Sequence, residues 1–503
     1  MAPADPQVAG PRTYGNWRRP SSPGLFGLGS LGTAIMLAGL VLVVIVIALA
    51  GLLRGVILAV VLAVVLAAIV TRDRHQKSIL DRVLARVSWM SATRRGAHLY
   101  RSGPLGFALW GTHQLPGLAA SLRLSEHTDS YGRPFALIFA PATSTYTVVI
   151  GTEPDGASLV DPDQVDGWVA DWGHWLANLG DEPGVQAAAV TVETAPDTGH
   201  RLRREVESQL DPAGPEFARA MLAEVVAAYP VGSSLIKAYV TISFTSVGAA
   251  TGKKRTDTEM GRDLAARLPG LTGSLSTTGA GAARPLAAGE VCEVIRVAYS
   301  PGVASVVDTA HAHDEPSDLA WCDVGPAAAE ASWEHYRHDD GYSVTWSMTT
   351  APRGNVTSTV LARLLAPHRD VARKRVTLVY RPIDAARAAA IVESDLRAAE
   401  FLATSRARPS ARALQATRSS AAAAAEEAAG AGLVNFGLLV TATVTDPDRL
   451  PEARAAVDNL SATARLRLRP CYGSQDSAFA AGLPLGLILP RHLKAPAAMR
   501  DRL

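Results

Sequence analysis

The feature that most constrains this chain is a long apolar stretch near its N-terminus. Within residues 31–70 the only charged residue is Arg54. A helix rises about 1.5 Å per residue, so one helix of this length would extend roughly 60 Å, about twice the ~30 Å hydrocarbon core of a bilayer. We therefore predict two antiparallel membrane helices, at 31–53 and 55–71, with a turn at the sequence GLLRG (51–55).

The residues on either side of this stretch predict its orientation. Arginines precede the first helix and further basic residues follow the second. Because positive charges tend to stay on the cytoplasmic side, both termini and the main body are expected in the cytoplasm. Aromatic rings and arginine side chains also suit the headgroup layer. The predicted membrane-interface residues are Tyr14, Trp17, Arg18, Arg19, Arg54, Arg72 and Arg74.

A signal peptide is the competing interpretation of the first helix. The triplet Ala48-Leu49-Ala50 has the small-x-small form of a cleavage site. The apolar stretch before this triplet is longer than a signal peptide needs, and a second apolar helix follows it. We therefore predict an uncleaved, multi-pass protein of the inner (cytoplasmic) membrane.

The composition narrows the classes of protein to which the chain can belong. Its 503 residues include 49 Lys and Arg against 47 Asp and Glu, so charge gives no indication of direct, sequence-specific nucleic acid binding. The three cysteines lie far apart, at Cys292, Cys322 and Cys471. Such a sparse, odd set argues against a disulfide scaffold or a zinc site.

The rest of the chain, residues 72–503, has the pattern of an α+β protein. Short β-branched runs alternate with segments of helical periodicity, so we expect cytoplasmic ferredoxin-like α+β modules with one-sided sheets. A helical region at 383–430, interrupted by Pro409, predicts a long arm of two antiparallel helices. The predicted organisation is a cytoplasmic collar at 1–30, a transmembrane hairpin at 31–71, and three α+β units at 72–230, 231–370 and 371–503, the last with the long helices.

Individual elements follow from the periodicity of apolar residues. Trp168, Trp172 and Trp175 share one face of a predicted helix at 165–180, a spacing that favours core packing over a ligand site. Further helices are predicted at 215–229, 257–268 and 448–460. Strands are predicted at 136–140, 145–151, 185–196, 237–244, 342–352, 373–382, 435–445 and 464–470.

The last predicted strand alternates arginine with leucine. Arg465, Arg467 and Arg469 would share one face, with Leu466 and Leu468 on the other. One interpretation is a solvated outer face. The other is a basic strip that contacts an acidic partner, and the three arginines are candidate partner contacts on this ground.

One segment resembles a phosphate-binding P-loop but departs from it. TSVGAATGKKRT (245–256) follows a predicted strand, as a P-loop does. Only three residues separate Gly248 from Gly252, where a P-loop has four. Lys253 is followed by Lys254, so the hydroxyl that would hold Mg²⁺ is missing. We therefore predict a basic hairpin or loop here.

Two histidine-rich segments contain candidate ligands for a metal site. Their candidate ligands have donor types that zinc accepts, but the second segment reads more simply as a turn before a strand. The pattern H-x-x-H also lacks the glutamate of an H-E-x-x-H helix. No metal, cofactor or catalytic residue is predicted. The residues concerned are His311, His313, His335, His338, Asp339 and Asp340.

Several segments resemble proteins of conjugative transfer machines. The collar TYGNWRRPSSPGLFGLGSLGT (13–33) and the hairpin are similar to the PrgI-like inner-membrane subunit of type IV secretion systems, and to the start of an actinobacterial integral membrane protein family found with conjugative elements. LPGLAASLRL (115–124), the strand-helix-strand ending at Pro470, and DSAFAAGLPLG (476–486) look like the N-terminal, non-catalytic domain of the conjugation ATPase. The resemblance does not extend to the nucleotide-binding domain, so it implies no ATPase activity.

This resemblance implies a structural subunit of a conjugation or type IV secretion-like machine, not an enzyme. Its expected partners are the inner membrane, a separate P-loop motor ATPase and other channel subunits, within an oligomeric assembly. Candidate contacts with the motor are the helices at 383–430 and the arginine strip. Two alternatives stay open: a type VII secretion component resembling EccE, which also has two N-terminal helices and a cytoplasmic α/β body, and a membrane-tethered nucleotide- or metal-binding enzyme.

Overall fold

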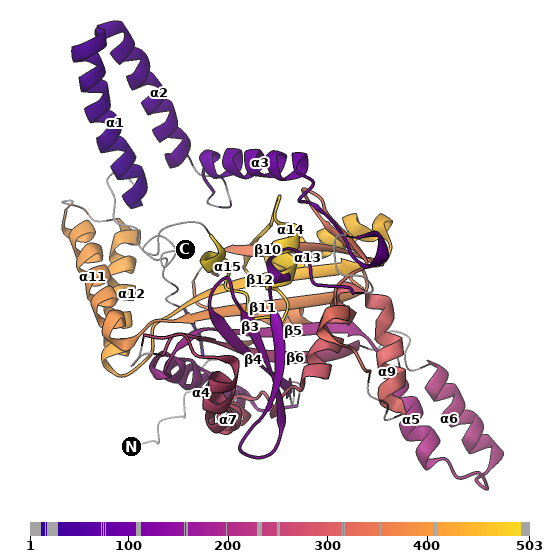
Figure 1. The fold of residues 1–503 in the computed structure, drawn as a ribbon. Coiled ribbons are helices and arrows are strands. Elements are labelled where there is room, and N and C mark those ends of the chain that lie inside the picture. Colours follow the sequence, from indigo (N-terminus) through magenta and orange to yellow (C-terminus); the bar gives the residue numbers. More distant parts are fainter. Residues whose placement is uncertain are drawn as a thin grey trace, which may run out of the picture.

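A computed structural model describes the chain from Arg12 to Leu493 with gaps, and Figure 1 shows its arrangement. Two apolar helices stand apart from a mixed α+β body, which confirms the predicted fold class at this level. The described residues are 12–15, 17, 29–71, 73, 75, 77–106, 112–154, 156, 159–197, 199–228, 234–248, 252–313, 315, 317–352, 354–405, 408 and 410–493.

The two apolar helices, α1 (Gly29–Ala50) and α2 (Leu52–Val70), form a hairpin. Gly51 joins them with a φ of 92°, a positive value that glycine adopts without strain. Gly39 faces Leu62 across the hairpin so closely that a Cβ on Gly39 would lie 2.5 Å from the leucine side chain. Small residues at such points let two membrane helices approach each other.

The body contains one antiparallel sheet, which has thirteen strands within the described ranges. Its order is β1-β8-β9-β10-β12-β11-β5-β6-β4-β3-β2, with β13 beside β10 and β7 beside β4. The strands are β1 (Leu99–Arg101), β2 (Arg123–Thr128), β3 (Pro134–Ala140), β4 (Thr145–Glu153), β5 (Val185–Pro196), β6 (Ser234–Thr245), β7 (Ala282–Pro285), β8 (Ala328–Ala331), β9 (Tyr336–His338), β10 (Gly341–Thr350), β11 (Arg373–Pro382), β12 (Val434–Val444) and β13 (Arg467–Pro470).

Helices cover both faces of this sheet. The body helices are α3 (Ile79–Arg94), α4 (Pro162–Asp181), α5 (His200–Gln209), α6 (Glu216–Ala228), α7 (Asp257–Gly273), α8 (Ala288–Tyr299), α9 (Ala304–Ala312), α10 (Ala362–Leu365), α11 (Ala385–Thr404), α12 (Ala411–Ala428), α13 (Leu450–Thr463), α14 (Gln475–Ala481) and α15 (Leu489–His492).

The alternation of side chains along each strand divides the core between the two faces. Val148 and Ile150 on β4 point toward α4 and α7, and on the same face Val344 and Trp346 on β10 pack with α10 and α13. Val149 points to the opposite face, which α8, α14 and the segment after α14 cover. The body therefore has three layers, with the sheet in the middle. The predicted one-sided sheets are wrong, because both faces of the strands carry apolar side chains that helices cover.

The sheet consists of two halves with the same topology. Read from its centre outward, one half has the order β5-β6-β4-β3 and the other has β11-β12-β10-β9. In each half a hairpin leads through a helix to a strand. A pair of helices, a second strand, a helix and a short strand that pairs with the hairpin then follow. The halves meet where β5 pairs with β11 in antiparallel register. This arrangement relates them by an approximate two-fold axis.

Side-chain pairs support this equivalence residue by residue. Thr147 and Ser243 share a hydroxyl–hydroxyl hydrogen bond of 2.9 Å between β4 and β6. The corresponding bond between β10 and β12 joins Ser343 and Thr443 at 2.7 Å. At the seam itself, Thr191 of β5 lies opposite Thr377 of β11 with their hydroxyls 3.1 Å apart, where an approximate two-fold would place equivalent residues.

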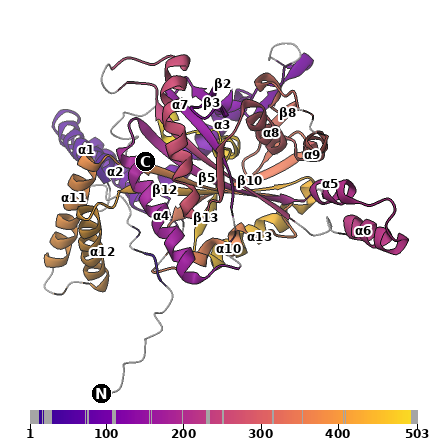
Figure 2. The same cartoon turned by 90° about the horizontal axis from the view of Figure 1, so that it is seen from below.

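The helical pair inserted in each half forms a projecting arm. The pair α5 and α6 connects β5 to β6, and the pair α11 and α12 connects β11 to β12. Figures 1 and 2 show the two arms leaving the body on opposite sides. The predicted arm at 383–430 is thus present as α11 and α12, whereas the arm of α5 and α6 was not predicted as a unit.

Most predicted strands and long helices are present with small differences in their ends. Trp175 is buried as expected, and Trp172 stacks on it with ring centroids 4.8 Å apart. The helices α3, α5, α8, α9 and α14 were not predicted. Strands from all three predicted α+β units join in the one sheet.

Candidate functional site

The hairpin presents apolar side chains to its surroundings. Gly32–Ala50 and Leu52–Val70 are long and apolar enough to cross a membrane. Large residues such as Leu40, Val44 and Val60 are exposed along its length. Arg54 lies in the first turn of α2, at the end of the hairpin that is farthest from the body (Figure 1). An arginine there would reach the headgroups of the distal membrane surface.

Two of the predicted interface residues contact the body in the structure. The Tyr14 hydroxyl donates to Asp166 Oδ1 at 2.7 Å, and the Tyr14 backbone pairs with Val356. The Trp17 ring meets Phe436 of β12 edge-on, with centroids 5.3 Å apart. The sequence predicted headgroup contacts for both rings, but it held no information on these partners. Arg18, Arg19, Arg72 and Arg74 lie outside the described residues.

The arginine strip is only partly a strand. Arg467 and Arg469 lie on β13, while Arg465 precedes it with a φ of 55°. Leu466 and Leu468 are buried beneath, as the alternation predicts. Arg465 donates to the Asn355 carbonyl at 3.4 Å, and Arg469 lies over the Tyr472 ring at 5.1 Å. A role of the three arginines in binding a partner stays a prediction.

The P-loop-like segment is a tight hairpin in the part that the structure describes. Val247 and Lys254 form a backbone bridge, and the Gly248 amide donates to the Lys253 carbonyl at 3.0 Å. Residues 249–251 lie outside the described ranges. These contacts agree with the predicted basic hairpin.

The histidine-rich segments are dispersed among separate partners. His311 lies 2.9 Å from Glu293 Oε2, whereas the Asp340 carboxylate accepts from the Ser300 hydroxyl at 2.7 Å. Asp339 pairs with Arg296 at 3.0 Å. Within the described ranges, no three His, Cys, Asp or Glu side chains come together as a metal site.

His338 takes part in a buried hydrogen-bond chain that resembles part of a nucleophile–base pair. Its Nε2 lies 2.7 Å from the Ser343 hydroxyl, and its Nδ1 lies 2.6 Å from the Tyr299 carbonyl. Nδ1 must therefore carry the proton, and Nε2 accepts from the serine. Both side chains are fully buried, so no substrate can reach them. These hydrogen bonds stabilise the core on the face of the sheet that α8 and α14 cover.

A buried ion cluster spans the seam between the two halves. Glu193 of β5 lies directly opposite Arg375 of β11, and the carboxylate accepts from Arg375 Nε at 2.9 Å. Arg373 contacts the same carboxylate. Burial acts to raise the pKa of Glu193, but the charges of Arg375 and Arg373 outweigh it and lower the pKa to about 2. The sequence does not indicate this cluster, because its members are about 180 residues apart along the chain.

A pocket adjoins this cluster between the sheet and the helices α8 and α9. Glu193 and Arg373 line it, together with Lys237, Tyr239 and His311. Burial is the main cause that raises the pKa of the Tyr239 phenol, with the Glu193 charge as the next contribution. The acidic and basic groups here largely neutralise one another, so the pocket gives no indication of ligand charge.

Two helices carry apolar side chains on exposed surfaces. On α6 the spacing of Phe217, Met221 and Val225 places them on one face, and Phe217 is 76% exposed. Figure 2 shows α6 at the outer end of its arm, away from the sheet. On α3 the exposed apolar residues include Val83 and Val87. Apolar faces of this kind commonly mark contacts with proteins or membranes.

Comparison with known proteins adds one match. A family described as "Domain of unknown function (DUF8461)" matches residues 21–81. The match covers the hairpin and the beginning of α3 and leaves the α+β body outside it. A search among curated proteins finds no match.

Proposed function

We propose that this protein is a membrane-anchored structural subunit of a conjugation or type IV secretion-like transfer machine. In this proposal α1 and α2 span the inner membrane, with both termini and the body in the cytoplasm. The body then docks a separate P-loop motor ATPase beneath the channel. The apolar hairpin supports the anchor, and the resemblance of the collar and of the segment 476–486 supports the class of machine.

The observation that carries the docking role is the apolar face of α6. An exposed stripe of Phe217, Met221 and Val225 is costly for a surface that meets only water. Its arm lies at the opposite end of the molecule from the hairpin (Figure 1), where a cytoplasmic motor has room to approach. We therefore place the principal motor contact on α6. The arm of α11 and α12 and the arginine strip are secondary candidates.

We further propose that each half of the body is a ferredoxin-like module with an inserted arm. In the first half, β4, β5, β6 and β7 take the four strand positions, with α4 and α7 as the two helices. Their spatial order, β5-β6-β4-β7, supports this assignment, since a ferredoxin-like sheet has the second strand of the chain beside the third and the first beside the fourth. The order β11-β12-β10-β13 supports the same assignment for the second half.

Site-specific photo-cross-linking in the native host tests the docking role. The full-length protein would carry a photoreactive amino acid in place of Phe217, or in place of Tyr131 as a matched control. Tyr131 is also aromatic and 74% exposed, but it lies in the turn between β2 and β3. We expect position 217 to capture a P-loop ATPase, identified by mass spectrometry, and position 131 to capture none. Repeated capture of no ATPase at 217 would contradict the proposal.

A further inference from the structure

The helix α3 lies at the base of the hairpin and runs crosswise to it (Figure 1). Residues 71–78 connect the end of α2 to its start. A capping box fixes this start, because the Ser78 hydroxyl accepts from the Asp81 amide at 3.0 Å and the Asp81 carboxylate accepts from the Ser78 amide at 3.1 Å. The residue at which α3 begins is therefore fixed by its own sequence.

One side of α3 is fastened to the body. The Trp89 ring meets Trp333 and His98 edge-on, with centroids 6.0 and 6.2 Å apart. The Arg86 guanidinium lies 4.7 Å from the centre of the Trp333 ring. Trp333 in turn stacks on Tyr472, so these contacts connect α3 to the edge of the sheet. They define the inner side of the helix.

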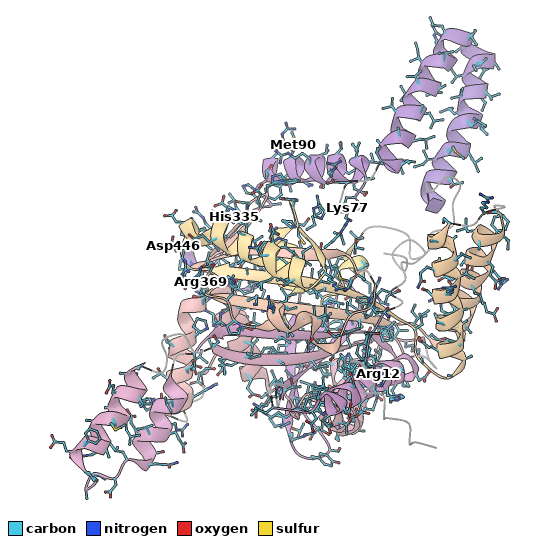
Figure 3. The ribbon with its side chains drawn as sticks, turned by 180° about the vertical axis from the view of Figure 1, so that it is seen from behind. Arg12, Lys77, Met90, His335, Arg369 and Asp446 are labelled. Carbon is cyan, nitrogen blue, oxygen red and sulfur yellow. The ribbon has the colours of Figure 1, made fainter. Side chains whose placement is uncertain are left out.

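The outer side of α3 is apolar, the reverse of an ordinary surface helix. Val87 is 57% exposed and lies roughly opposite Trp89, since each residue turns the helix by about 100°. Figure 3 shows Met90 on the side of α3 that is turned away from the sheet. A surface helix of a soluble protein would place polar residues here. The exposed apolar residues of α3 are Ile79, Val83, Leu84, Val87 and Met90.

Basic residues flank this apolar side. Arg86, which contacts Trp333, lies between the inner side and the apolar side, and Arg94 and Arg95 lie at the C-terminal end. Arg82 lies on the inner side and pairs with Asp73 at 3.9 Å, and Asp81 is the acidic residue of α3. A helix with an apolar side and arginines close to it is typical of segments that lie in the plane of a membrane surface. The positive charge would favour anionic headgroups.

We propose that α3 lies in the interface of the same bilayer that holds the hairpin, with its apolar side in the headgroup–acyl boundary. The hairpin supplies the reason for a lipid occupant: a bilayer around α1 and α2 would have its surface at their base, at the height of α3 in Figure 1. The outer side of α3 faces that surface. Because α3 would contact lipid on one side and Trp333 on the other, it would fix the tilt of the body relative to the membrane. This inference rests on the membrane anchorage of the proposed function.

Fluorescence quenching in lipid nanodiscs tests the inference on the full-length protein. The background would be Cys322→Ser with Cys471→Ser, because Cys292 is buried. A single environment-sensitive probe would be attached through Val87→Cys on α3, or through Val306→Cys on α9 as a control valine that is 65% exposed. A third protein, Val60→Cys on α2, reports insertion of the hairpin. Discs of phosphatidylcholine and phosphatidylglycerol would contain acyl-chain nitroxide lipid, and iodide would serve as the aqueous quencher.

We expect nitroxide lipid to quench the probe at 87 at least about twofold more than the probe at 306, and iodide to show the opposite order. If the probes at positions 87 and 306 were quenched equally, while nitroxide lipid quenched the probe at position 60, the inference would be overturned and the membrane anchor would stand. Protection of 87 from both quenchers would also overturn it, because a protein partner would then cover α3. A probe at 60 that lipid does not quench would instead contradict the membrane anchorage.

Discussion

Replacement of Glu193 by Gln is expected to destabilise the body more than any surface substitution. The carboxylate joins β5 to β11 and is almost fully buried between Arg373 and Arg375. The amide of Gln keeps the size of the side chain but removes its charge. The buried guanidinium group of Arg375 and the partly buried one of Arg373 would then lack their counter-ion.

The size of the effect follows from the pKa of Glu193. A decrease from the ordinary value of 4.5 to about 2 corresponds to about 3 kcal/mol of stabilisation at neutral pH, at about 1.4 kcal/mol per pKa unit. Removal of one partner of a buried ion pair commonly costs about 3–5 kcal/mol. We therefore expect Glu193→Gln to lower the free energy of unfolding by about 3–5 kcal/mol at pH 7.

The pH dependence gives a second, independent signature. Because the folded state lowers the pKa of this acid, its stabilisation is fully present above about pH 4.5 and is lost as the pH falls toward 2. The difference in stability between the native protein and Glu193→Gln should therefore shrink over that range. If the difference in stability between the native protein and Glu193→Gln stayed constant with pH, its cause would be a packing defect instead of a lost ion pair.

Urea unfolding of the full-length protein in detergent, followed by tryptophan fluorescence, measures this difference. Glu334→Gln is the matched control, since Glu334 pairs with Arg454 at 2.7 Å on the surface. Exposed pairs of that kind contribute about 0–1 kcal/mol. If Glu193→Gln unfolded at the same urea concentration as the control, the reasoning about the seam would be refuted.

Three further predictions concern the core and the thiols. Burial lowers the pKa of His338 to about 4, so the protein should lose stability as the pH falls from about 6.5 toward 4, and His338→Gln should show a smaller loss in urea titrations at pH 7 and pH 5. Gly486 has a φ of 67°, and a Cβ there would lie 2.1 Å from Thr147 Oγ1, whereas Gly132 has a φ of 79° and open surroundings. Gly486→Ala should therefore lower the thermal midpoint clearly more than Gly132→Ala. Equal decreases would show that backbone conformation alone sets the cost. An aromatic disulfide reagent should modify Cys322 much faster than Cys292, because Cys292 is buried and burial raises its thiol pKa to about 12; fast modification of both in the folded protein would be incompatible with the core around α8.

Local sequence patterns predicted elements whose signal is contained within a few residues. The strands predicted at 373–382 and 185–196 match β11 and β5 at both ends. The helical arm was predictable because Ala-rich segments favour helix strongly and Pro409 interrupts them. Helix α3 was not predicted from the sequence, although it follows closely on the second apolar helix.

The buried ion cluster at the seam could not be predicted, because it depends on contacts between residues that are distant in sequence. Glu193 and Arg375 are ordinary charged residues within two strands until the pairing of β5 with β11 brings them together. The partners of Tyr14 and Trp17, at Asp166 and Phe436, are likewise set only by the tertiary fold. Periodicity identifies which side of an element is apolar, but not which protein or lipid covers it.

The approximate two-fold axis also governs which chains can combine. Two copies of the first half could in principle join through β5 alone, as a swapped assembly between neighbouring molecules. In that case Glu193 would face Ala189, the counterpart of Arg375, and a buried negative charge would find no cation. Likewise, two copies of β11 would leave Arg375 facing Val379. The acid on β5 and the base on β11 therefore favour pairing of β5 with β11 over pairing of either strand with a second copy of itself.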